Sequence, residues 1–145
     1  MALPKIIQFP LGDTENLQYH YTKVNISSAE ILALNSTPVT LVTAPGAGYV
    51  LMPINAIVKM NFGTIVYGAN TDLGIVHDGL TTQLLPLAAL INRASDWIKF
   101  IPLCEQGYSA ATSENKSLDL LCDTGDPTGG DGNLDIYLWY IKLLL

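Results

Sequence analysis

The chain has 145 residues, of which 49% are hydrophobic and 14% are charged, and its formal net charge at pH 7 is −6. This length fits a single domain with a sizeable core. Binding to a nucleic-acid backbone requires clustered Lys and Arg residues, and the 7 basic residues are scattered along the acidic chain, so we expect no nucleic-acid partner. No uninterrupted apolar run approaches the length of about 18 residues that a membrane helix needs, so we expect no membrane partner.

The scarcity of charged residues is itself informative, because charged side chains make up about a quarter of an average protein. A small domain with so few charges has little polar surface to present to water. We therefore expect part of its surface to be covered by another subunit, as in a homo-oligomer.

Residues 1–18 contain Pro4, Pro10 and Gly12 and show no periodicity. They lack the long apolar stretch and the cleavage site of a secretory signal. We expect an extended N-terminal arm here, with a frayed terminus as the alternative, and a single β-sandwich domain over residues 19–145.

Alternation and a helix-capping motif predict a first strand and a short helix after it. The stretch Tyr19 to Ile26 alternates like a strand. Ser27 and Glu30 then form a capping box, which predicts a helix from Ala29 to about Leu34. Because such a helix is too short to be stable alone, it must be held by the packing of its apolar side chains, Ile31, Leu32 and Leu34.

Residues Val39 to Val42 alternate with threonines and predict another strand with one buried face. The turn Ala44 to Gly48 contains a proline and two glycines, which favour reversal of the chain. The apolar stretch Tyr49 to Phe62 predicts a long strand at the centre of a sheet, or two strands bent at Pro53.

Short strands are predicted at Thr64 to Tyr67 and at Leu73 to His77, joined by a hairpin loop at Gly68 to Asp72. The span Leu80 to Asp96 is ambiguous. Its leucines fit a helical period, whereas Leu85-Pro86-Leu87 also fits the end of a strand, and we predict a short helix here.

After this span we predict a strand at Trp97 to Leu103 and an exposed loop at Gln106 to Lys116. A strand at Ser117 to Cys122 and turns at Asp123 to Gly132 follow. The last strand, Leu134 to Leu143, has apolar residues on both faces, so we expect it to be covered on both sides. About eight short strands, frequent turn signals and one or two short helices predict an all-β fold, a jelly-roll-like antiparallel β-sandwich.

The sequence contains no G-x-S-x-G, G-x-x-x-x-G-K-[ST] or H-E-x-x-H motif, so we predict no catalytic and no cofactor-binding residue. The two histidines are His20 and His77. Although Asp78 follows His77, adjacent residues of a strand face opposite ways and cannot pair as base and carboxylate. A hydrolase would need one of these histidines in a cleft beside a Ser or Cys nucleophile. Cys104 and Cys122 are expected to be free thiols, with a single bridge as the alternative.

The acidic loop is the best candidate for a metal site, because Asp123, Asp126 and Asp131 could offer oxygen ligands to Ca²⁺. The loop does not match the EF-hand or the calcium-binding nonapeptide pattern. We therefore interpret it as a set of turns and predict no metal site. Five aromatic side chains could form a platform for a sugar, although strands and oligomer interfaces also favour such residues: Tyr19, Tyr21, Tyr137, Trp139 and Tyr140.

Three motifs resemble small structural proteins of tailed bacteriophages. They are the capped segment Ser28 to Pro38, the segment Leu41-Val42 with the turn Ala44 to Gly48, and the loop Gly125 to Gly132 before a terminal strand. The resemblance covers roughly residues 24–77 and 117–142. It is closest to jelly-roll decoration or cement proteins, which are non-enzymatic.

This resemblance implies a homotrimer on the capsid exterior of a virion, made in the bacterial cytoplasm and bound between subunits of the major capsid protein. The arm Met1 to Leu17, the segment Leu80 to Asp96 and the terminal Ile141 to Leu145 are the expected contacts. The alternative is a head-fibre or tail component, or a host-recognition module that binds carbohydrate.

Overall fold

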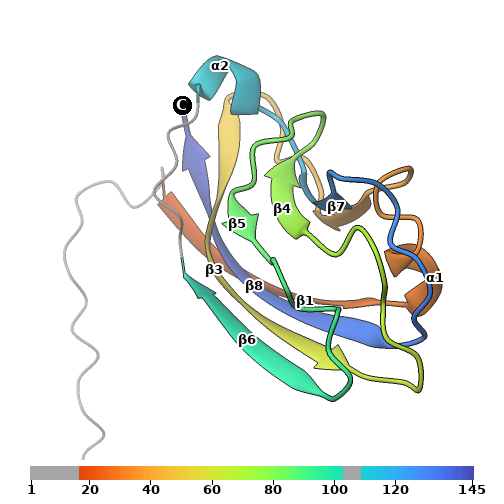
Figure 1. The fold of residues 1–145 in the computed structure, drawn as a ribbon. Helices are drawn as coiled ribbons and strands as arrows, with labels where there is room; N and C mark the ends of the chain where they lie inside the picture. The colour runs from red at the N-terminus through yellow and green to blue at the C-terminus, as the bar shows by residue number, and fades with distance from the viewer. Residues whose placement is uncertain (1–16, 103–108) are drawn as a thin grey trace, which may run out of the picture.

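The computed structural model describes residues 17–102 and 109–145. Most of the predicted N-terminal arm therefore lies outside the described residues. Figure 1 shows a β-sandwich with two short helices at its ends. In chain order the elements are β1 (Leu17–Ile26), α1 (Ser28–Ile31), β2 (Val39–Val42), β3 (Tyr49–Asn61), β4 (Leu73–His77), β5 (Leu85–Pro86), β6 (Trp97–Pro102), α2 (Ala110–Ser113), β7 (Leu118–Cys122) and β8 (Asn133–Leu144).

The strands form two four-stranded sheets with the orders β1-β8-β3-β6 and β2-β7-β4-β5. Every strand pair is antiparallel. Successive strands repeatedly cross from one sheet to the other, which is the connectivity of a jelly roll. The predicted fold class is confirmed. In Figure 1 the longer sheet, β1-β8-β3-β6, curves around the shorter one.

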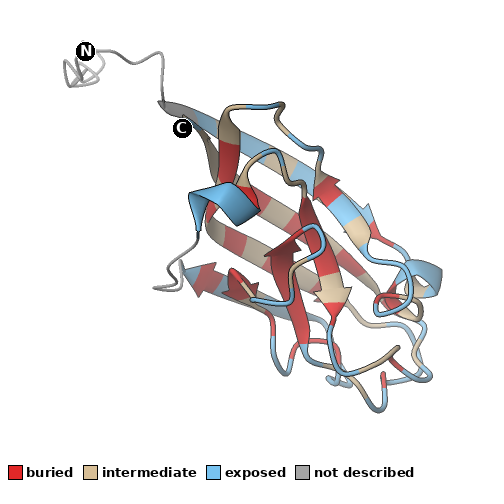
Figure 2. Ribbon diagram, turned by 90° about the horizontal axis from the view of Figure 1, so that it is seen from above, coloured by how far each residue is buried: buried red, intermediate tan, exposed pale blue. Residues whose placement is uncertain are grey.

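The two central strands of the longer sheet, β3 and β8, build the core by strict alternation. Leu134, Ile136 and Leu138 of β8 are fully buried. They pair with Met60, Val58 and Ala56 of β3, which are buried as well. Side chains between them on each strand face away from the second sheet, because successive residues of a strand point to opposite faces. Figure 2 shows this alternation as bands of buried and less buried residues.

The long strand predicted from Tyr49 to Phe62 is confirmed as one continuous strand. Its pairing with β8 shifts register between Pro53 and Asn55. Proline lacks the N–H that a ladder requires, so the irregularity lies where the sequence predicted a bend. The turn before β3 is confirmed too, since Gly46 and Gly48 take positive φ values of 100° and 79°.

The capping box is confirmed at the start of α1. The Ser27 hydroxyl accepts the N–H of Glu30, while the Glu30 carboxylate accepts the Ser27 N–H at 2.7 Å. The helix ends at Ile31, earlier than predicted, and turns follow it. Ile31 and Leu34 are fully buried and Leu32 packs against the core.

Two predicted elements are wrong. Residues 64–67 form no strand, because their backbone groups are held by a neighbouring loop: the Thr64 N–H donates to Asp131, and the Gly68 N–H donates to the carbonyl of Thr128. The span Leu80 to Asp96 contains β5 and turns in place of a helix. Ala89 takes a φ of 57°, which no right-handed helix accommodates.

Two further expectations need correction. The exposed loop predicted at Gln106 to Lys116 contains α2, whose Ser113 is buried; residues 106–108 lie outside the described part. Strand β8 is covered by the second sheet on one side, whereas its other face is half-buried at Tyr137, Trp139 and Ile141. The apolar residues on that face therefore need another explanation.

Candidate functional site

The outer surface of the longer sheet carries the largest group of exposed apolar side chains in the described part of the chain. We call it the aromatic face and define it by the exposed residues Tyr19, Tyr21, Ile98 and Phe100 together with the half-buried Ile57, Tyr137 and Trp139 between them. Tyr19 is 70% exposed, Ile98 65% and Phe100 59%. A single exposed apolar residue is normal on a protein, but a contiguous group over four strands marks a contact surface.

Strand register places these side chains in rows across the sheet. Tyr21 of β1 is paired with Trp139 of β8, and their ring centroids are 5.1 Å apart. In the next row Tyr137 is paired with Ile57, and Ile57 with Phe100 of the edge strand β6. Alternation within each strand and register between strands thus bring residues that are far apart in sequence onto one surface.

The aromatic face ends in a polar row around Asp135. The Asp135 carboxylate accepts hydrogen bonds from Asn25 at 3.1 Å and from Asn61 at 3.2 Å. These bonds, together with the charge of Lys23, lower the pKa of Asp135. A hydrogen bond with Tyr137 and the charge of Asp135 raise the pKa of Lys23, whose ammonium lies 5.2 Å from the Tyr137 ring centroid. The sheet face is therefore divided into an apolar part and a charged border, and Ile98 on the edge strand β6 lies at the end of that border, paired with Lys59.

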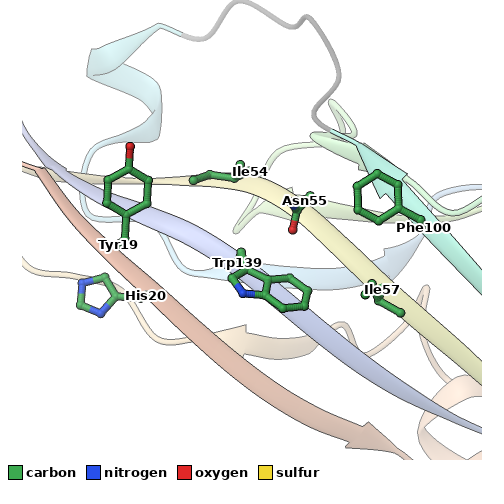
Figure 3. Close-up of a pocket in the computed structure, with 7 residues that line it drawn as sticks. All are labelled: Tyr19, His20, Ile54, Asn55, Ile57, Phe100 and Trp139. Atoms are coloured by element: carbon green, nitrogen blue, oxygen red, sulfur yellow. The ribbon is translucent and has the colours of Figure 1, made fainter. Parts of the chain in front are cut away.

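A hollow of about 440 Å³ opens on the aromatic face. All four strands of the longer sheet contribute to it, as Figure 3 shows. Its lining side chains include Tyr19, Ile54, Trp139 and Phe100. Asn55 supplies a polar group, and its Oδ1 is buried without a hydrogen-bond partner among the described residues. This volume is within the usual range of ligand pockets.

The predicted aromatic platform is only partly confirmed. Tyr19, Tyr21, Tyr137 and Trp139 share the aromatic face, but Tyr140 does not, because its position in β8 points toward the other sheet. There it stacks on His20 with ring centroids 5.1 Å apart, and burial raises the pKa of its hydroxyl. The ring of His20 thus lies on the side of β1 opposite to Tyr19, while His20 also borders the hollow.

His77 ends β4 and is fully buried, with its Nε2 2.7 Å from the carbonyl oxygen of Leu51. Burial lowers the pKa of its imidazole. It lines a small hollow of about 150 Å³ together with Ser109 and Ser113. The Ser113 hydroxyl makes no hydrogen bond to a described residue, so the bond that activates a serine nucleophile is not formed here.

In the loop 123–132, Asp126 and Asp131 accept hydrogen bonds from the backbone of two different segments. Asp126 accepts the N–H groups of Asn35 and Ser36 at 2.8 and 3.0 Å. Asp131 accepts the N–H groups of Thr64 and Ile65, both at 2.8 Å. These bonds lower the pKa of both carboxyls. No group of three or more His, Cys, Asp or Glu residues suited to a metal occurs within residues 17–102 and 109–145.

Cys122 is a buried free thiol that donates to the carbonyl of Asn70 at 3.0 Å. Cys104 lies outside the described residues.

The predicted contact segments differ in how far they are exposed. The apolar side chains Leu84, Leu85, Leu87, Leu90 and Ile91 are buried in the core. They are therefore not available to a partner, whereas residues 92–96 of that segment and the terminal Leu144 and Leu145 are exposed.

Sequence reasoning missed Asn55, Ile57, Ile98 and Phe100 as members of one surface. Their exposure depends on the register of β3 and β6, which single-strand alternation does not specify. The sequence does carry one signal of such a surface, because several strands have apolar residues on both of their faces.

Comparison of the chain with protein-family models, with curated proteins and with solved structures gives no significant match. In the part of the chain that the structure describes, no helix has the length and hydrophobicity to cross a membrane.

Proposed function

We propose that this chain is a non-enzymatic structural protein of a tailed-phage virion. It decorates the capsid exterior as a homo-oligomer, with a trimer favoured, and stabilises the capsid by binding between subunits of the major capsid protein. The observation that carries the proposal is the aromatic face, an apolar surface on one sheet of the sandwich in a chain with few charges.

The mechanism is burial of this apolar surface against neighbouring subunits. Aromatic side chains contribute large contact areas at interfaces with little loss of side-chain freedom. A capsid offers many equivalent sites, and an oligomer that engages several of them gains avidity from modest individual affinities. The charged border around Asp135 gives the contact a defined edge, because mismatched charges at the rim disfavour wrong registers.

The proposal is tested by co-sedimentation of the purified protein with expanded heads of the phage that encodes it. We expect saturable binding that Ile98→Ser weakens strongly, because Ile98 is 65% exposed on the aromatic face and does not line the hollow. Ile65→Ser is the matched control, because Ile65 is also an exposed apolar residue, at 57%, but lies in a loop away from the aromatic face. Absence of binding by the unmodified protein would refute the decoration role.

A carbohydrate-binding, host-recognition role is the second candidate, since aromatic rings line the hollow and Asn55 could bond a hydroxyl. It is the weaker one because a sugar carries several hydroxyl groups, whereas Ile54, Ile57 and Phe100 offer the hollow no polar atom and its polar groups are few, chiefly the Asn55 amide, the Tyr19 hydroxyl and the Trp139 N–H. A glycan array with strong hits that Trp139→Ser abolishes would favour it over decoration.

A further inference from the structure

We infer that the hollow on the aromatic face receives the segment Pro4 to Pro10 of a neighbouring copy of this chain. The inference rests on the proposed function, because it presupposes a homo-oligomer. It assigns the residues that line the hollow to the contact between copies and leaves Tyr21, Ile98 and Tyr137 of the aromatic face to the capsid contact. The hollow and the segment that fills it then belong to two copies of the same chain.

The hollow has the chemistry of a site for an apolar peptide. Tyr19, Trp139 and Phe100 present rings, Ile54 and Ile57 present aliphatic carbons, and Asn55 presents a side-chain amide. Aromatic-lined grooves with few polar groups bind extended segments that contain proline, because such segments lose little conformational entropy on binding. An unsatisfied buried amide is costly, so a backbone N–H of a bound peptide that reaches Asn55 adds specificity.

The segment Pro4 to Pro10, with the sequence PKIIQFP, matches these requirements. Ile6, Ile7 and Phe9 are apolar, and the flanking prolines restrict their own backbone and that of the preceding residues to extended conformations. A bound extended strand alternates its side chains, so Ile7 and Phe9 face the same surface and fit a hollow of this volume.

The position of the segment favours a neighbouring copy over its own hollow. Residues Leu17 and Gln18 still pair with Leu143 and Lys142 at the end of the sheet, and Tyr19 of the hollow follows directly. Because β1 begins at this end of the sheet, the segment could reach the hollow of its own copy only if the chain reversed direction before Leu17. Residues 11–16 separate Pro10 from Leu17 and can span roughly 20 Å when extended, which limits the distance between Leu17 and the hollow of the neighbouring copy.

The test is photo-cross-linking in the full-length protein. Phe9 is replaced by a photoreactive phenylalanine analogue in both unlabelled and ¹⁵N-labelled protein, the two preparations are mixed and refolded together, and cross-linked peptides are identified by mass spectrometry. We expect cross-links to peptides that contain Trp139 or Phe100, and we expect unlabelled peptides joined to labelled ones. Phe100→Ser should reduce the yield at least several-fold, whereas Ile65→Ser should not.

Cross-links confined to peptides of the same label would show that the segment binds its own chain and would overturn the inference. Cross-links to other surfaces, or none, would overturn it too. Circular dichroism of Phe100→Ser verifies that a lost cross-link does not reflect unfolding. Because capsids are absent from the experiment, its outcome is separate from that of co-sedimentation: labelled–unlabelled cross-links without capsid binding would refute decoration and support this contact.

Discussion

The carboxylate of Asp131 receives two hydrogen bonds from Thr64, one from its N–H at 2.8 Å and one from its hydroxyl at 2.7 Å. The two residues belong to loops that are distant in sequence, one after β3 and one before β8. These bonds fix the loop 62–72, which has no regular secondary structure of its own, against the end of the longer sheet.

We predict that Asp131→Asn lowers the stability of the protein more than Asp123→Asn, a change in the same loop. An asparagine cannot accept hydrogen bonds through both of its terminal atoms. The native bonds lower the pKa of Asp131 below its ordinary 3.8, so their contribution is present above that value and is lost as the pH falls through the folded pKa. Thermal unfolding at pH 7 and pH 3 measures this: the difference between Asp131→Asn and the unmodified protein should shrink at pH 3.

Gly130 and Gly46 provide a second comparison. Both take positive φ values, 88° and 100°, so alanine at either position strains the backbone by about 1–2 kcal/mol. At Gly46 a Cβ would meet no atom within 4 Å, whereas at Gly130 it would overlap the ring of the buried Tyr67. Urea denaturation should show a clearly larger loss of unfolding free energy for Gly130→Ala. Equal losses would mean that the Tyr67 ring moves aside without cost.

The buried His77 predicts a pH dependence near neutrality. Because burial lowers its pKa from the ordinary 6.5, the unfolded chain binds this proton more readily than the folded protein. Stability is therefore full above pH 6.5 and falls as the pH decreases toward the folded pKa. Urea midpoints between pH 8 and pH 5.5 should decline, and His77→Gln should flatten that decline.

The segment that was predicted to be a helix supplies the fourth prediction. Leu87 is fully buried, so Leu87→Ala should reduce the free energy of unfolding by about 2–5 kcal/mol. Ile98 is 65% exposed on the aromatic face, and Ile98→Ala should change it by no more than about 0.5 kcal/mol. Chemical denaturation of both variants tests this assignment of core and surface. A small effect at Leu87 would contradict the placement of residues 80–91.

Local signals in the sequence predicted much of the sandwich. Alternation located β1, β2 and β8, and the capping box identified Ser27 as the N-cap of α1. These elements are recognisable because the determining residues are neighbours in the chain. Two errors arose where distant residues decide. The segment Thr64 to Tyr67 has the composition of a strand, but the backbone N–H groups of Thr64 and Ile65 donate to Asp131 and are not available to a strand partner. The spacing of Leu84, Leu87 and Leu90 matches a helical period, although these side chains enter the core from a segment without helix.

The aromatic face was predicted less completely than the fold. Tyr21 and Trp139 were recognised as candidates for a common platform, and the structure places them side by side. Phe100 and Ile57 were not, since the relation between them depends on how β6 aligns with β3. Tyr140 does not belong to this surface, because it directly follows Trp139 in β8 and successive residues of a strand point to opposite faces.

The order of the longer sheet has a consequence for biosynthesis. Strand β8 lies between β1 and β3, yet it is the last of the eight strands to be translated. While the ribosome is still adding residues before Asn133, β1 has no partner in its sheet and the apolar stretch of β3 lacks its main neighbour. The nascent polypeptide therefore exposes aggregation-prone strand edges until translation has passed β8, and the sandwich closes only after that final strand inserts.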